Sequence, residues 1–228
     1  MSMTRRNYSQ FCGLAHALDI VGERWTLLIV RELGSGPKRY TNLADALPGI
    51  GTSLLATRVR QLEADGVIQR RLLLDQPASA VAYELTEAGR ELATAVIPLA
   101  LWGARHQLAE ADAGAEVFRA EWALGFLAGS GAGAVPSELE ALYEFHIGDS
   151  VACLRIRDGR MSVSPGPAVT APDVVVRASA SVLGSIAGQR TTMAEAVRAG
   201  LVEATGDPAA IGALIGIVEG SLSVFGPA

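Results

Sequence analysis

The sequence predicts an α+β protein with two domains. Its 228 residues exceed the roughly 150 residues of an ordinary domain. Apolar side chains recur at three- and four-residue steps through most of residues 1–108, which indicates helices, whereas after residue 138 they alternate as in strands. Residues 109–115 follow neither pattern. We therefore expect one domain at 1–108 and a second at 116–228.

Composition and charge limit the function classes. Half of the residues are apolar and 19% are charged, so the chain can bury a core and is not disordered. The formal net charge of −5 argues against a nonspecific polyanion binder. The charge is unevenly divided, because residues 1–108 carry 12 basic and 10 acidic side chains and residues 109–228 carry 7 and 14. By this count the first half can face a polyanion and the second should not.

The first domain begins with a series of short helices. Apolar residues at helical spacing predict a helix that ends at Gly22 and a second that stops at the Gly- and Pro-containing residues 34–37. Thr41 is expected to cap a short third helix. Thr52 or Ser53 is expected to cap a fourth.

A hairpin and a long helix follow. Residues 67–73 and 81–85 have the composition of strands, and residues 75–79 have that of a turn. Thr86 is a good N-cap for a long helix that contains Pro98, where we expect a kink.

Helices followed by a two-stranded hairpin are the element order of a winged helix-turn-helix. A helix fits the major groove of DNA, and a basic hairpin beside it can hold phosphates. In the fourth helix we expect Leu54, Leu55, Val59 and Leu62 to face inward. An ordinary solvated surface is the alternative interpretation of its polar residues. The candidate DNA-binding residues are Lys38, Arg39, Thr52, Ser53, Thr57, Arg58, Arg60, Arg70 and Arg71.

Residues 5–106 resemble the HxlR-type family of bacterial winged-helix regulators. The resemblance implies a homodimeric transcription regulator on a palindromic operator, with a dimer interface made by the first helix and the long helix after the wing. The matching segments are Cys12, 18–29, 31–33, 39–43, Ile50, 54–55, 58–68, 83–89, Pro98 and Trp102.

Six apolar side chains would form that interface. The alternative is that they belong to the core of the domain itself. They are Phe11, Leu14, Leu18, Val96, Leu99 and Trp102.

Cys12 is a candidate redox sensor. It matches the position of a sensing cysteine in several members of the family, although Gly13 replaces the usual proline after it. Cys12 and His16 are four residues apart and share a helix face, where a protonated imidazole and a helix N-terminus lower a thiol pKa. The alternatives are metal binding by the pair and simple packing of a small apolar side chain.

The second domain is expected to alternate strands and helices. A helix over about 116–127 precedes a flexible linker at 129–134. The predicted strands are 142–147, 151–156, 161–163, 173–178 and 201–205, with a hairpin turn at residues 158–159. The predicted helices are 179–187, 192–199 and one that opens at Asp207 or Pro208 and runs to about 225.

Residues from about 138 to 225 resemble a sterol carrier protein-like domain. The matching segments are 143–147, 157–160, 172–176, 183–188, 193–197 and 200–207. The resemblance implies helices stacked on one face of a curved sheet around an apolar cavity, which would take a hydrophobic small molecule. A filled core is the alternative. From periodicity, the candidate pocket residues are Leu142, Phe145, Leu154, Leu183, Ile186, Leu214 and Val218.

We expect no enzyme, cofactor or metal site. His16, His106 and His146 are scattered, and the sequence shows no nucleophile–base pair and no metal-type spacing. Two cysteines do not make a disulfide framework. No signal peptide is visible, and the apolar stretch 208–218 is too short to span a bilayer, so a cytoplasmic protein is expected.

Three functions remain open at this point. The first is a DNA-binding transcriptional regulator that responds to a ligand or to redox state. In it, a hydrophobic effector would change the spacing of two recognition helices about 34 Å apart. The second is a lipid- or acyl-carrying protein whose N-terminal half only dimerises it. The third is an enzyme that uses the C-terminal cavity.

Overall fold

A computed structural model describes residues 7–73, 80–111, 115–130 and 135–224. It divides into two compact units, Met1–Ala93 and Thr94–Ala228. The division falls inside helix α5 (Glu87–His106), whose Leu101 packs into the core of the second unit. The domain limits 1–108 and 116–228 stay a sequence-based prediction.

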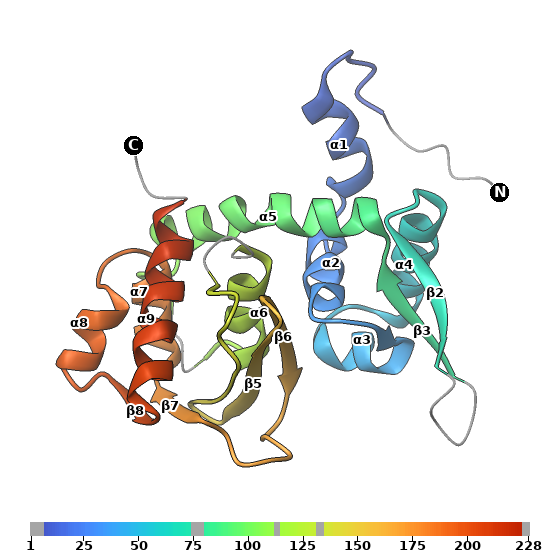
Figure 1. Ribbon diagram of the computed structural model, residues 1–228. Helices are drawn as coiled ribbons and strands as arrows, with labels where there is room; N and C mark the ends of the chain where they lie inside the picture. The colour runs from blue at the N-terminus through green and yellow to red at the C-terminus, as the bar shows by residue number, and fades with distance from the viewer. Residues whose placement is uncertain (1–6, 74–79, 112–114, 131–134, 225–228) are drawn as a thin grey trace. The chain divides into compact units, whose positions relative to one another are not determined.

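The first unit is a winged helix-turn-helix, as predicted. Helices α1 (Gly13–Val21), α2 (Thr26–Gly34), α3 (Tyr40–Ala46) and α4 (Thr52–Ala64) precede an antiparallel hairpin of β2 (Ile68–Leu73) and β3 (Ala80–Leu85) (Figure 1). Strand β1 (Lys38–Arg39) pairs with the other edge of β3, so the sheet order is β1-β3-β2. Sequence analysis missed β1 because two residues are too few to show alternation. The predicted turn at 75–79 lies outside the described residues.

The core of the first unit joins its helices to the root of the hairpin. Ile29 and Leu33 of α2 pack with Leu43 of α3, and the hairpin closes the core with Ile68 and Leu85. Helix α4 contributes Leu55, Val59 and Leu62, while Leu54 is half-buried. Burial of this stripe fixes the orientation of α4 about its own axis.

Helix capping in the first unit differs from the prediction at two of three sites. Arg39 precedes α3 and Gly51 precedes α4, so Thr41, Thr52 and Ser53 lie inside helices rather than at their caps. Thr86 does cap α5, because its Oγ1 accepts the Gly89 N–H at 3.1 Å. A side chain at Gly89 would collide with the carbonyl oxygen of Val67, so this turn requires glycine.

The second unit contains a five-stranded sheet of order β6-β5-β4-β7-β8. Strands β4 (Ala141–Ile147) and β7 (Val174–Ala178) are parallel, and the other neighbours are antiparallel. The remaining strands are β5 (Ser150–Arg157), β6 (Arg160–Pro165) and β8 (Val202–Gly206). Asp158 and Gly159 join β5 to β6 with φ of 51° and 67°, the left-handed geometry of the predicted two-residue turn.

Helices of the second unit pack their apolar side chains against one face of this sheet. They are the later part of α5, α6 (Ala120–Ser130), α7 (Ala180–Ala187), α8 (Met193–Arg198) and α9 (Pro208–Ser223). Tyr143, Phe145 and Ile147 of β4 meet them, because alternate residues of a strand share a face. Helix α9 starts at Pro208, one of the two predicted starts, and the Asp207 side chain caps it by accepting the N–H groups of Ala209 and Ala210.

Two predictions for the second unit are corrected. Helix α6 begins at Ala120, later than the expected 116, and continues through Gly129 and Ser130, so the expected linker does not start there. The rest of that linker, 131–134, lies outside the described residues. No helix in the described part of the chain is long and apolar enough to cross a membrane.

The candidate pocket residues do not all meet. Phe145, Leu154, Ile186, Leu214 and Val218 belong to one buried cluster, and Leu183 packs against it half-buried. Leu142 is buried but outside that cluster. It lies three residues before Phe145, and strand alternation puts an odd-numbered separation on opposite faces. The grouping of Leu142 with Phe145 was therefore wrong.

Candidate nucleic-acid interface

The exposed side of α4 carries hydroxyl and guanidinium groups. Ser53 and Arg60 are exposed, Thr57 is half-buried between them, and Thr52 is exposed at the start of the helix. Arg60 lies back along the helix, with its Nε donating to the Ala56 carbonyl at 3.2 Å. Hydroxyl and guanidinium donors of this kind bind phosphates and base edges. This face therefore has the chemistry that sequence analysis assigned to it.

Arg58 does not point outward, which corrects the prediction. Its side chain is only 13% exposed, with Nη2 2.6 Å from Glu23 Oε2 and Nη1 2.6 Å from Gln61 Oε1. The reason is helical periodicity, because position 58 is three residues after buried Leu55 and four before buried Leu62. Its Nε is buried without a hydrogen-bond partner. Arg58 thus joins α4 to the turn after α1.

A cavity borders the same flank of α4 inside the first unit. Its volume is about 890 Å³, and Tyr8, Asp19 and Glu23 line it opposite Leu54 and Arg58. The N-terminal segment is held there by the Tyr8 N–H, which donates to Asp19 Oδ1 at 3.1 Å. The turn between α1 and α2 and the flank of α4 therefore form one connected region.

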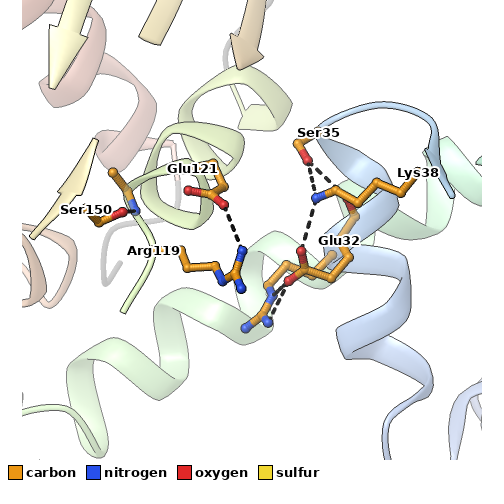
Figure 2. A network of polar contacts seen from close by, with 8 residues as sticks. Glu32, Ser35, Lys38, Arg119, Glu121 and Ser150 are labelled. Atoms are coloured by element: carbon orange, nitrogen blue, oxygen red, sulfur yellow. Dashed lines mark hydrogen bonds and ion pairs between the residues drawn. The ribbon is translucent and has the colours of Figure 1, made fainter. Parts of the chain in front are cut away.

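Lys38 is also internal rather than free for DNA. Its Nζ lies 3.1 Å from Glu32 Oε2 and 3.0 Å from the Ser35 hydroxyl (Figure 2). Arg31 holds the other oxygen of the same carboxylate, with Nη2 2.8 Å from Oε1. The Glu32 side chain is fully buried, so these two cations offset its desolvation. Lys38 consequently anchors β1 to α2.

The remaining basic candidates lie on the sheet of the first unit. Arg39 is half-buried in β1. Arg70 and Arg71 of β2 are each 56% exposed and pair with carboxylates of the same unit, Glu63 at 3.0 Å and Glu84 at 3.2 Å. Such exposed pairs are weak, so a phosphate can compete with them. DNA contact by Arg70 and Arg71 stays a prediction.

The predicted dimer residues are largely exposed. Phe11, Leu14, Leu99 and Trp102 are each more than half exposed, Leu18 is 37% exposed and Val96 is half-buried. The ring of Trp102 also contacts that of His106 in a tilted arrangement, with ring centroids 5.4 Å apart. These side chains thus do not belong to the core of their own units, and the first four are unusually large and apolar for a solvated surface.

Cys12 lies at the N-cap of α1 and is exposed. The backbone N–H groups of Ala15 and Leu14, which face the sulfur at the helix start, lower the pKa of this thiol. The predicted contribution of His16 is not among these causes. Cys153 is buried, and burial raises its thiol pKa. Within the described ranges, no group of three or more histidine, cysteine or acidic side chains is placed to hold a metal.

Sequence analysis missed the carboxylates that hold the two internal cations. Glu32 and Glu23 lie 6 and 35 residues from Lys38 and Arg58. The helical spacing of Leu55, Arg58 and Leu62 was a usable signal for the orientation of Arg58. No signal in the sequence indicates that Glu23 lies beside it.

Two family models match the chain. Residues 20–111 match the HxlR-like helix-turn-helix model, and residues 131–219 match the SCP-2 sterol transfer family. Neither model alone covers half of the chain.

Several curated proteins are similar to less than half of the chain. A Bacillus subtilis protein, the uncharacterized HTH-type transcriptional regulator YtcD, is 39% identical over 104 residues, which are 46% of this chain and 80% of that protein. The Synechocystis regulator sll1512 is 40% identical over 88 residues, and the match spans 39% of this chain and 64% of that protein. The B. subtilis HTH-type regulator YodB is 34% identical over 38% of this chain and 76% of its own length.

Among solved structures, the reduced form of YodB shows 30% identity over 43% of this chain and 96% of its own, with a TM-score of 0.38.

The winged helix and its exposed α4 define the class of this protein as helix-turn-helix transcriptional regulators. The chain belongs to the HxlR-like helix-turn-helix family. Its second unit is a domain of the SCP-2 type, which confirms the predicted fusion of the two.

Replacing Glu32 by alanine should destabilise the first unit by about 3 kcal/mol, because it leaves two partly buried cations without their carboxylate. Chemical denaturation, monitored by circular dichroism, measures the loss in the free energy of unfolding. The matched control is Glu63→Ala, which removes the half-buried partner of an exposed cation, Arg70, and should cost under about 1 kcal/mol. Equal losses in the two variants would contradict the structural role of Glu32.

Proposed function

We propose that this protein is a homodimeric regulator that inserts α4 into the major groove of an operator and holds the flanking phosphates with its hairpin. The observation that carries the proposal is that α4 buries its apolar face and exposes its polar face. Leu55, Val59 and Leu62 are buried, which leaves Ser53 and Arg60 exposed. An exposed polar helix face beside an arginine-bearing hairpin has the donors that a duplex requires.

The proposed contacts fall into two groups. Ser53, Thr57 and Arg60 are placed for base edges and nearby phosphates, with Thr52 at the helix start. Arg39, Arg70 and Arg71 are placed for the backbone, where they add affinity without sequence information. We assign Lys38 and Arg58 to positioning, since both side chains are mostly buried and already paired, Lys38 with buried Glu32 and Arg58 with exposed Glu23.

Arg60→Ala should weaken binding to a selected operator at least tenfold, because one guanidinium contact to a base or phosphate is worth about 1–3 kcal/mol. The measurement is fluorescence anisotropy of labelled operator duplex across a salt series, with the operator obtained by selection from random sequences.

Arg198→Ala is the matched control, since Arg198 is an exposed arginine of the second unit, at the end of α8. It should leave operator affinity unchanged. An Arg60→Ala protein with unaltered operator affinity and salt dependence would overturn the proposed interface.

Homodimerisation is supported by the exposed apolar residues of α1 and α5. Leu99 and Trp102 lie three residues apart on α5 and share one face of that helix, 53% and 51% exposed. A second copy that covers them would remove large apolar surfaces from water. Two half-sites would then be read by two copies of α4.

Leu99→Glu with Trp102→Glu should convert the dimer to a monomer, because it places two carboxylates in an apolar contact. Sedimentation velocity measures the change, and operator affinity should fall with it. The control is Leu201→Glu, an exposed leucine of the second unit. A dimer that survives the double substitution argues for a different interface.

A redox response through Cys12 is a second element of the proposal. The thiol is exposed, and the helix N-terminus lowers its pKa, which raises the fraction of reactive thiolate at neutral pH. A peroxide would transfer one oxygen atom to the sulfur to form a sulfenic acid, with water as the other product. The alternatives are a metal ligand and a packing role, and exposure of the thiol disfavours packing.

Hydrogen peroxide should weaken operator binding of the unaltered protein and leave Cys12→Ser unaffected. Anisotropy before and after treatment measures this, and mass spectrometry locates the added oxygen. Cys153→Ser is the control, since that thiol is buried and should not change the response. Equal sensitivity of the unaltered protein and Cys12→Ser would end the sensor proposal.

We propose that the second unit binds a hydrophobic effector. The support is its match to the SCP-2 sterol transfer family and its large apolar core, which includes Phe145, Leu154, Ile186 and Leu214. Native mass spectrometry of the purified protein tests for a retained ligand. The rival function is a lipid or acyl carrier. In that case the Arg60→Ala variant would retain the ligand, and the unaltered protein would bind no operator.

A further inference from the structure

The second unit carries an arginine-rich patch on its sheet. We call it the hairpin patch and define it as Arg155, Arg157, Arg160, Ser162 and Ser164. Leu154 and Ile156 of β5 are buried under the helices, so the residues between and after them belong to the opposite face. Strand register places Arg155 opposite Ser162 and Arg157 opposite Arg160. The patch therefore occupies one face of the β5–β6 hairpin.

The side chains of the hairpin patch are exposed and largely unpaired. Arg157 makes one ion pair, with Asp158 at 3.8 Å, in which both side chains are at least 70% exposed. Arg155 and Arg160 have no hydrogen bond or ion pair to any described residue. By contrast, Arg119 and Arg190 of the same unit bind a carboxylate and backbone carbonyls.

The patch is a local reversal of charge. Residues 109–228 hold 7 arginines and 14 acidic residues, and three of those arginines are on this one hairpin. The nearest strand carboxylate, Glu144 of β4, is engaged by the Ala168 N–H at 2.7 Å and His146 at 2.7 Å. The net negative charge of residues 109–228, from which we expected no contact with a polyanion, therefore does not describe this surface.

The arrangement is unfavourable for the isolated unit. Arg157 and Arg160 are directly opposite in the antiparallel register, and like charges in such a pair destabilise a hairpin. An anion that lies across the two strands would remove the repulsion. Arg155 and Arg157 are two residues apart, about 7 Å along the strand, so the three arginines can contact more than one anionic group.

We propose that the hairpin patch binds the phosphate backbone of DNA, as a contact additional to the winged helix. Charge complementarity and the mixture of guanidinium and hydroxyl donors support a phosphodiester chain. This proposal rests on the proposed function, since a chain that reads an operator tethers its second unit close to the same duplex. Tethering raises the effective concentration, so a weak contact becomes occupied.

An anionic membrane is the less favoured occupant. Binding at a bilayer surface combines basic residues with apolar side chains that enter the acyl region. The hairpin patch has the basic residues without any apolar member, because Met161 and Val163 face the core.

The test compares the full chain with Arg155→Ala/Arg157→Ala/Arg160→Ala on a mixed-sequence duplex of roughly four helical turns. Phosphate binding is independent of sequence and releases counterions, so the slope of log affinity against log salt reports the number of contacts. The triple variant should lower that slope by nearly 3, at about 0.9 for each lost phosphate contact. The corresponding triple lysine variant should retain most of the slope.

The control is a pair of single variants. Arg155→Ala should lower the slope of log affinity against log salt, and Arg198→Ala should leave it unchanged. Circular dichroism and thermal melting show whether the alanine variants stay folded. An unchanged slope in the folded triple variant overturns the proposal. A second outcome would also overturn it: the triple variant no longer co-sediments with phosphatidylglycerol vesicles, as the unaltered protein does, but still binds DNA as before.

The two proposals fail in different ways. If Arg60→Ala leaves operator affinity unchanged while the triple variant lowers the slope, the α4 interface is wrong and the hairpin patch stands. If the reverse holds, only the hairpin patch is wrong. A full chain that binds no duplex overturns both.

Discussion

The burial of one side of α4 is the constraint on which the first unit depends. Leu55, Val59 and Leu62 can leave water only by packing against α2, α3 and the root of the hairpin. That contact sets the rotation of the helix about its axis, and the rotation decides which polar side chains are presented outward. Ser53 and Arg60 are exposed for this reason, and Arg58 is drawn to the flank. A chain with the same arginines on a helix rotated by one position would present a different surface.

Burial divides the basic residues of the first unit into two kinds. Glu32 and Glu23 take Lys38 and Arg58 into ion pairs that connect β1 to α2 and α4 to the turn after α1. Arg70 and Arg71 are more than half exposed, so water and salt weaken their ion pairs with half-buried Glu63 and Glu84. Charge count alone treats all four alike. What distinguishes them is burial of the cation, because Lys38 and Arg58 are 18% and 13% exposed whereas Arg70 and Arg71 are each 56% exposed. A phosphate does not readily reach a cation that is mostly buried.

Strand alternation organises the second unit in the same way that helical periodicity organises the first. One face of the sheet supports the helices, and the other carries the polar residues, including the three arginines of the β5–β6 hairpin. The unit as a whole is acidic, yet its surface charge is not evenly spread. The net charge of this unit therefore does not describe the charge of each of its surfaces.

Element type and order were determined by the sequence itself, since periodicity and turn residues act locally. This covers α1 to α4, the β2–β3 hairpin, the turn at Asp158 and the start of α9 at Pro208. These local patterns did not determine which of the candidate DNA-binding and pocket residues are exposed. The partners of Lys38 and Arg58, the pairing of β1 with β3 and the separation of Leu142 from Phe145 required the folded chain. Each depends on which distant segments come together, and a local pattern carries no information about a contact between residues 35 positions apart.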